Sequence, residues 1–256
     1  MKKFSFVVCP NALPVADFPQ FLETVSKTKI KNIGVRTSWI PFDGLDQTDL
    51  KISNFGVYSN FAEKEKQKEL LDILELSETL HIPLVNIATY PDISTKDQRN
   101  SAAFFRDAAA CAKEKNLQLT METYGIMTRT AEECLRLVEA VDHETFQICY
   151  DTANVWRFAP EFKTGNDLTG DFRKLKGHIG YMHLKDFEPE TKTITVLGKG
   201  GVDYPAIFSL LEDWDYNGFV GLDLETSRAC ALNTLAAHEE ELHLSLEYLN
   251  SLDVIK

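Results

Sequence analysis

Short apolar runs alternate with segments of helical period along most of the chain. Eight of these runs have the length and composition of strands. They are Lys3–Cys9, Ile33–Thr37, Phe55–Ser59, Leu84–Tyr90, Leu117–Thr123, Phe146–Tyr150, Gly180–Leu184 and Phe219–Leu224. Eight strands that alternate with helices, with no break in composition, predict one α/β domain over residues 1–256, a single (β/α)8 TIM barrel.

The segments between these runs carry apolar residues at helical spacing. Glu63–Leu80 is the clearest example, because Leu70 and Leu74 fall on one side and Lys and Glu residues on the other. Further helices are expected over Asp17–Val25, Asp97–Lys115 and Thr130–Val141, from Ala206 onward, and over about Thr234–Leu252. The stretch Trp156–Gly177 shows no clear period and receives no assignment.

Four of the later apolar runs end in an ionisable side chain. The segments LTMETYG, QICYDTAN, IGYMHLKD and FVGLDLETS supply Glu122, Asp151, His183 and Glu225. The carboxyl ends of barrel strands open on one face, which is where barrel enzymes carry their sites. The pattern therefore predicts a site at that face. A doubly wound open sheet is the rival fold, but its G-x-G-x-x-G turn after the first strand is missing.

Composition narrows the function classes. The 256 residues carry a net charge of −12, which argues against a nucleic-acid surface. No run approaches the roughly 20 apolar residues of a membrane helix, and the N-terminal MKKFSFVVCPN is interpreted as a strand, not a signal peptide. Five scattered cysteines without CxxC spacing indicate reduced thiols. We therefore expect a cytoplasmic protein with a small-molecule partner and no membrane or nucleic-acid partner.

Carboxylates combined with one imidazole are suitable ligands for a divalent ion. Carboxylate oxygens favour Mg²⁺ and Mn²⁺, and an imidazole shifts the preference toward Mn²⁺, Co²⁺ or Zn²⁺. The four strand-end residues would provide four ligands. The alternative for each residue taken singly is a solvated polar strand end, but four such ends on consecutive strands favour a site.

The motifs YDTANVW, YMHLKD, LGKGGVDYPAIF and FVGLDLET resemble the xylose isomerase-like TIM barrel superfamily, in particular its sugar phosphate isomerase/epimerase branch. METYG adds the remaining glutamate. The resemblance is most specific over residues 119–227. It implies that Glu122, Asp151, His183 and Glu225 are ligands of one divalent ion, with Mn²⁺ the first choice and Mg²⁺, Co²⁺ or Zn²⁺ the others. It also suggests a homodimer or homotetramer.

The activity implied by the resemblance is isomerisation or epimerisation of a sugar or sugar phosphate. A proton leaves the carbon next to a carbonyl through a metal-stabilised enediolate, and Glu122 and Glu225 remove and return it. Return to the same carbon gives epimerisation, and return to the adjacent carbon gives isomerisation. Which glutamate acts as the base stays open.

Four further residues are candidates for substrate binding, namely Arg36, Asn154, Lys185 and Asp186. Asn154 stands where the family often has a histidine. Arg36 can bind a hydroxyl or phosphate, or pair with a nearby acid. Asp186 can orient a ligand or cap a strand end. Weaker phosphate candidates are Lys199 and Arg228, and Trp39, Tyr90 and Trp156 are candidates for an apolar wall.

Three alternatives to the isomerase remain open. A metal-dependent lyase of the same superfamily, acting on a cyclitol or dehydroshikimate-type acid, would use the same ligands. An abasic-site endonuclease is disfavoured by the acidic charge and by strand ends VYSN and IATY that lack histidine. A non-catalytic barrel is disfavoured by the intact ligand set.

Overall fold

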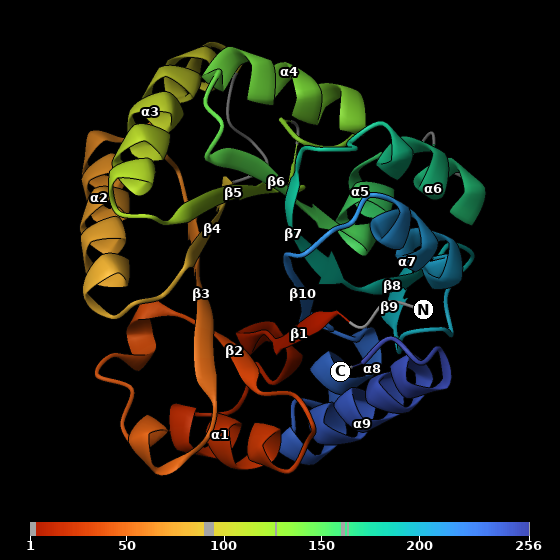
Figure 1. Ribbon diagram of the computed structural model, residues 1–256. Coiled ribbons are helices and arrows are strands. Elements are labelled where there is room, and N and C mark those ends of the chain that lie inside the picture. The colour runs from red at the N-terminus through yellow and green to blue at the C-terminus, as the bar shows by residue number, and fades with distance from the viewer. Residues whose placement is uncertain (1–3, 90–94, 126, 160–161, 163, 256) are drawn as a thin grey trace.

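Eight parallel strands close into a barrel in the computed structural model, which describes residues 4–89, 95–125, 127–159, 162 and 164–255 (Figure 1). The order around the barrel is β1-β10-β7-β6-β5-β4-β3-β2. Its strands are β1 (Ser5–Val8), β2 (Asn32–Val35), β3 (Lys51–Ser59), β4 (Leu84–Thr89), β5 (Gln118–Glu122), β6 (Phe146–Asp151), β7 (Ile179–Leu184) and β10 (Phe219–Leu222). The predicted TIM barrel is confirmed.

Helices surround the barrel between its strands (Figure 1). The expected ones are α1 (Phe18–Ser26), α2 (Lys64–Thr79), α3 (Thr95–Glu114), α4 (Ala131–Val141), α7 (Tyr204–Asp213) and α9 (Leu235–Ser251). Asp17 caps α1 as predicted, accepting a hydrogen bond from the Gln20 backbone N–H. The stretch without an assignment contains the end of α5 (Thr152–Phe158) and all of α6 (Gly165–Arg173). A short α8 (Ser227–Leu232) was not predicted.

Alternation along each strand separates two apolar layers. Met182 and Leu184 of β7 belong to the large core between barrel and helices. Tyr181 belongs to a smaller core inside the barrel, together with Cys9 and Cys149. Because side chains alternate along a strand, the series that begins with Tyr181 continues at His183 and Lys185 on the inward side. Inward residues at the carboxyl ends therefore line the mouth of the barrel.

Strand β3 is longer than the sequence pattern predicted, beginning at Lys51 instead of Phe55. Its early part contains the buried polar residues Ser53 and Asn54. The Ser53 hydroxyl donates to the Ile33 carbonyl, and Asn54 Oδ1 accepts from Tyr181 inside the barrel. Polar groups that are satisfied within the core interrupt the hydrophobic pattern without interrupting the strand.

A two-stranded antiparallel ribbon follows β7 directly. It pairs β8 (Asp186–Glu188) with β9 (Thr193–Thr195) and precedes α7. Trp156 of α5 packs against Phe187 of β8, with ring centroids 5.8 Å apart. The ribbon and α5 therefore lie together at the carboxyl ends of β6 and β7.

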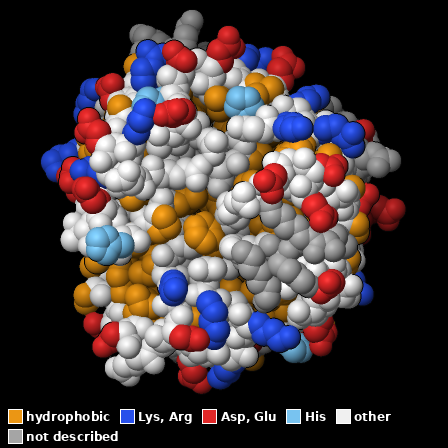
Figure 2. Space-filling model, in the orientation of Figure 1, with side chains coloured by type: hydrophobic (Ala, Val, Ile, Leu, Met, Phe, Trp, Pro, Cys, Tyr) orange, Lys and Arg blue, Asp and Glu red, His pale blue; other side chains and the backbone are white. Residues whose placement is uncertain are grey.

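The surface carries charges of both signs. On the face seen in Figure 2, Lys/Arg and Asp/Glu side chains are mixed around the edge, and hydrophobic side chains gather left of the centre. Among the helices described, none combines the length and the hydrophobicity required to span a bilayer.

Candidate metal centre

Four buried side chains converge at the carboxyl end of the barrel. They are Glu122 at the end of β5, Asp151 at the end of β6, His183 on β7 and Asp223 directly after β10. One potential ligand atom from each lies within 4.8 Å of all the others. The register explains part of this convergence, because Asp151 and His183 are paired across β6 and β7.

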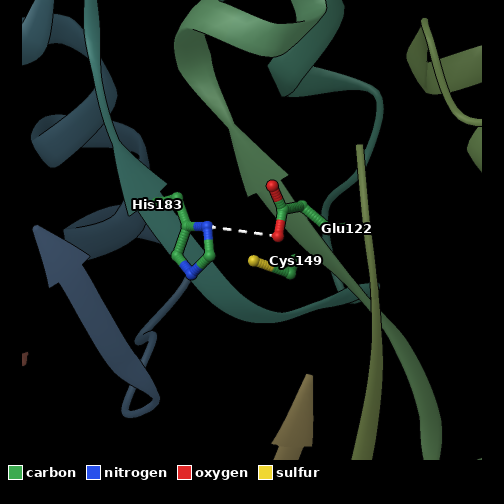
Figure 3. Close-up of side chains that lie close together, drawn as sticks. All are labelled: Glu122, Cys149 and His183. Carbon is green, nitrogen blue, oxygen red and sulfur yellow. Dashed lines mark ion pairs between the residues drawn. The ribbon is translucent and has the colours of Figure 1, made fainter. Parts of the chain in front are cut away.

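The imidazole of His183 faces the three carboxylates through Nδ1. This atom lies 3.4 Å from Glu122 Oε2, 3.9 Å from Asp151 Oδ2 and 3.8 Å from Asp223 Oδ2. Figure 3 shows the His183 and Glu122 side chains pointing toward one another. His183 Nδ1, Asp151 Oδ2 and Asp223 Oδ2 are buried without a hydrogen bond of good geometry, and the two carboxylate oxygens face the Lys185 ammonium group and the imidazole. Buried polar atoms are rarely left unpaired, and a cation held between these three atoms would satisfy them all.

Glu122 is fixed by hydrogen bonds to both of its oxygens. Oε2 accepts from the Tyr58 hydroxyl at 2.7 Å and from Asn86 Nδ2 at 3.1 Å. Oε1 accepts from Asn154 Nδ2 at 3.0 Å. Asn154 was predicted to bind substrate, and the structure places its amide on this carboxylate. Donors of this kind hold a metal-binding carboxylate in one orientation.

The two carboxylate oxygens of Asp151 have different contacts, one with the backbone of α5 and the other with the cluster. Oδ1 caps α5 by accepting from the backbone N–H groups of Ala153 and Asn154, at 3.0 and 2.8 Å. Oδ2 faces His183. The helix cap thereby fixes the carboxylate whose second oxygen faces the cluster.

Lys185 extends toward the same carboxylates. Its Nζ lies 3.2 Å from Asp151 Oδ2, 2.8 Å from Asp223 Oδ2 and 2.7 Å from Glu225 Oε2. The side chain is only 2% exposed. Lys185 was predicted to bind substrate, and the structure places its ammonium group against these acids.

Glu225, predicted as a ligand, lies outside the group of four. Its side chain is 41% exposed, and its carboxylate pairs with Lys185. The backbone at Glu225 is left-handed, with φ of 42°, so the chain has already turned away from the strand. Asp223 stands in the cluster where the sequence analysis placed Glu225. Alternation is the signal that was missed, because Leu222 and Leu224 pack outward and Asp223 between them faces inward.

Asp186, predicted to contact substrate, instead anchors a loop. Its Oδ1 accepts from the backbone N–H groups of Phe187 and Val202, and its Oδ2 from those of Gly198 and Gly200. Four donors saturate the carboxylate and fold the LGKGG segment around it. A Cβ at Gly200 would lie 2.6 Å from the Phe187 carbonyl oxygen, so this loop requires glycine there.

Arg36 and the weaker candidates have different surroundings. The guanidinium of Arg36 lies over the Trp39 ring, 4.4 Å from its centroid, and its buried Nε has no hydrogen-bond partner. Arg228 forms ion pairs with Glu240 and Glu241. Tyr90 lies outside the described residues.

Cys149, which the sequence analysis treated only as a buried thiol, lies next to the cluster. It is the register partner of Glu122 across β5 and β6, and its sulfur lies close to Glu122 and His183 (Figure 3). Glycine on β10, next to β7, leaves room for the imidazole, since a Cβ at Gly221 would lie 2.7 Å from Cys9 Sγ and 3.0 Å from His183 Cδ2. The layer below the cluster is therefore tightly packed against the imidazole.

Comparison with known proteins agrees with this architecture. The family described as Xylose isomerase-like TIM barrel matches residues 43–252. The chain belongs to the xylose isomerase-like TIM barrel family.

Curated relatives within this family include several inosose dehydratases. That of Klebsiella pneumoniae (strain 342) is 24% identical over 226 residues, which cover 73% of this chain and 74% of the relative. That of Geobacillus kaustophilus (strain HTA426) is 28% identical over 142 residues, which cover 48% of this chain and 44% of the relative.

Solved structures of the same fold include an epimerase and a zinc-bound protein. D-psicose 3-epimerase from Clostridium cellulolyticum H10 superposes with a TM-score of 0.74 at 18% identity, covering 95% of this chain and 99% of the epimerase. The IOLI protein with a bound zinc atom gives 0.75 at 16% identity, covering 95% of this chain and 96% of that protein. At these identities the likeness establishes the shared barrel alone.

Electrostatics of this xylose isomerase-like barrel indicate a site that attracts cations. Burial raises the pKa of Asp151 to about 7, although Lys185 acts in the opposite direction. Burial alone disfavours the imidazolium, yet Cys149, Glu122 and Asp223 keep the pKa of His183 well above its usual range. The pKa of Lys185 is likewise raised, because its acidic neighbours outweigh burial. Protons on Asp151 and His183, together with the Lys185 ammonium group, thus offset the negative charge of the cluster. A bound divalent ion would offset the same charge.

The donor set fits a divalent ion. Three carboxylates and one imidazole suit Mn²⁺, Co²⁺ or Zn²⁺, and three carboxylates alone would suit Mg²⁺. The nearby Cys149 thiol adds a softer donor, which favours Zn²⁺ within that list.

Proposed function

We propose that this protein is a divalent-metal-dependent sugar or sugar phosphate isomerase/epimerase. One observation carries the proposal: three buried carboxylates and the His183 imidazole converge at the carboxyl end of the barrel, each with a ligand atom within 4.8 Å of the others. The proposed ligands are Glu122, Asp151, His183 and Asp223. An ion bound there would act as a Lewis acid that stabilises negative charge on a substrate oxygen.

The proposed proton-transfer groups are Glu122 and Glu225. They follow β5 and β10, which β6 and β7 separate in the barrel. One carboxylate takes the proton from the carbon beside the carbonyl, and the C–H electron pair moves toward the carbonyl oxygen. The other group returns a proton to the same carbon or to its neighbour. Lys185 positions Glu225 through the 2.7 Å contact.

A dehydratase is the second candidate, favoured by the curated relatives, which are named inosose dehydratases. The first step would be the same proton removal. The electron pair would then expel hydroxide from the next carbon, and the carboxylic acid formed in the first step would return its proton so that water leaves. The barrel and its proposed ligands are compatible with both reactions, so the choice between them depends on the substrate.

Proton exchange in D₂O separates these candidates. The Mn²⁺-loaded protein would be incubated with neutral ketoses, ketose phosphates, inosose and 3-dehydroshikimate, with a chelator-treated sample as the control. Metal-dependent deuterium uptake beside the carbonyl without loss of water supports the isomerase/epimerase. Uptake with loss of water supports the dehydratase. Exchange that survives chelation, or no exchange on any member of the panel, contradicts the proposal.

A further inference from the structure

We infer that the substrate of this site carries an anionic group, a carboxylate or a phosphate, and that Arg36 binds it across the barrel mouth from the metal ligands. This inference rests on the proposed function, because it assigns the other end of the same substrate. The evidence is the position of Arg36, its lack of a partner and the charge distribution around the mouth.

Arg36 continues the inward-facing series of β2. Ile33 and Val35 pack outward in the large core. Between them Gly34 faces the barrel interior, where a Cβ would lie 3.1 Å from Asn54 Oδ1. The backbone at Arg36 remains extended, with φ of −119° and ψ of 153°, so alternation directs this side chain to the same side as Gly34.

The barrel order places Arg36 opposite the ligand cluster. Three strands separate β2 from β6 in either direction around the closed sheet. Asp151 on β6 therefore lies across the mouth from Arg36 on β2. The acids lie on β5, β6 and the segment after β10, whereas Tyr58 and Asn86 on β3 and β4 are neutral. The mouth thus has an acidic side and a cationic side.

The guanidinium of Arg36 is held in place without an anion. Arg129, Arg136 and Arg228 each pair with glutamate. Arg36 has no ion pair within the part of the chain that the structure describes. Stacking on Trp39 fixes its plane, and its buried Nε has no partner. Nε and one terminal nitrogen form the edge that binds carboxylate or phosphate through two parallel hydrogen bonds.

The charges also determine how a substrate would be oriented. A molecule with a carbonyl at one end and an anion at the other would direct its anion away from the carboxylates and toward Arg36. The net charge of −12 does not prevent this, because a single fixed guanidinium dominates the potential at short range. Arg36 would thereby favour anionic substrates over neutral ones of the same shape.

A cavity elsewhere on the same side of the barrel is the competing anion site. It measures about 570 Å³ and is lined in part by Trp156, Arg157, Phe187 and Lys192. Arg157 resembles Arg36 in lying over an aromatic ring, 5.5 Å from the Phe158 centroid, and it too has no ion pair among the described residues. Its side chain is exposed and it lies on α5, outside the inward-facing series. Arg157 therefore provides a matched control.

The test compares Arg36→Met, Arg36→Lys and Arg157→Met in the full-length, Mn²⁺-loaded protein. Each would be assayed on matched pairs: a ketose and its phosphate, and inosose and 3-dehydroshikimate. Arg36→Met should raise KM for the anionic member about 10- to 100-fold, as expected for losing a charged hydrogen-bonded pair, and leave the neutral member within about threefold. Arg36→Lys should recover part of the loss, and Arg157→Met should match the wild type. The pair that responds distinguishes phosphate from carboxylate.

Calorimetric titration with inorganic phosphate, with chelator present, gives a readout independent of turnover. Binding by the wild type and Arg157→Met but not by Arg36→Met supports the inference, even if no substrate exchanges protons and the proposed function fails. Equal turnover of neutral and anionic substrates by wild type and Arg36→Met overturns the inference while the proposed function stands. Loss of phosphate binding in Arg157→Met alone also overturns it. Melting curves without ligand confirm that each variant is folded.

Discussion

Two buried aspartates, Asp151 and Asp186, lie near the same end of the barrel and have opposite surroundings. Asp186 accepts four backbone hydrogen bonds and leaves no oxygen free. Asp151 uses one oxygen to cap α5, and its other oxygen has no backbone donor and faces the side chains of Lys185 and His183. The comparison shows how to separate a structural acid from a functional one. A carboxylate bonded to backbone N–H groups holds the chain, whereas a buried carboxylate oxygen that faces other ionisable side chains marks a site that can bind a cation.

The largest effect should come from the functional side of this comparison. Glu122→Gln keeps the size of the side chain and removes the charge that would bind metal and transfer a proton. We expect turnover to fall by roughly 10²- to 10⁴-fold, as is typical for loss of a general base. Steady-state kinetics on the substrate found by proton exchange would measure it, and an unchanged melting temperature in chelator would show that the fold is intact. Activity within threefold of the wild type would remove Glu122 from the mechanism.

Asp223 and Glu225 sharpen the comparison, because both follow β10 and only one lies in the cluster. Asp223→Asn should weaken Mn²⁺ binding about 100-fold or more, since it removes a buried ligand and leaves Lys185 with fewer acids. Glu225→Gln should change Mn²⁺ affinity by about threefold or less, because its carboxylate lies outside the cluster and is partly solvated. Titration calorimetry with Mn²⁺ measures both. If Glu225→Gln weakened Mn²⁺ binding more than Asp223→Asn, Glu225 and not Asp223 would be the ligand.

The structural side of the comparison predicts a stability defect. Asp186→Asn replaces one accepting oxygen with an NH₂ group that faces backbone donors. Two backbone N–H groups would lose their partner, and unfolding free energy should fall by about 2–4 kcal/mol. Urea denaturation of the metal-free protein would measure this. Asp151→Asn is the control, and it should lose less stability, because one Asn oxygen can still cap α5. An equal loss in both variants would contradict the distinction.

These results show which parts of the site the sequence could specify. The strand positions of Glu122, Asp151 and His183 followed from apolar runs that end in polar residues. Asp223 was missed because it stands between two leucines, within a segment that has the pattern of a continuing strand. Only the alternation of inward and outward side chains shows that Asp223 faces the barrel interior. The roles of Asn154, Lys185 and Asp186 depend on which distant groups they meet. Asp186, for example, binds Gly198, Gly200 and Val202, and no local pattern specifies these contacts.

The smallest predicted effect is a pH dependence that couples the cluster to the metal. The native pKa of Asp151 is about 7 against an ordinary value of 3.8, and that of His183 is raised above 6.5. Both groups bind protons more strongly when folded, so the metal-free protein should lose stability as pH rises from about 4 through 7 and beyond. Divalent ions require the deprotonated forms, so Mn²⁺ affinity should increase over the same range, by about tenfold per pH unit for each group still protonated.

The difference in melting temperature between Mn²⁺-loaded and chelator-treated protein should therefore widen from pH 6 to pH 8. Measuring this difference cancels the titration of groups far from the cluster, which affects both samples equally. Glu23→Gln is a suitable control, because that exposed acid pairs with Lys27 at the end of α1 and should leave the widening unchanged. A difference that stays constant with pH would mean that Asp151 and His183 do not exchange protons for the ion. Asp151 would then resemble Asp186, an acid whose role is to hold the chain through backbone hydrogen bonds.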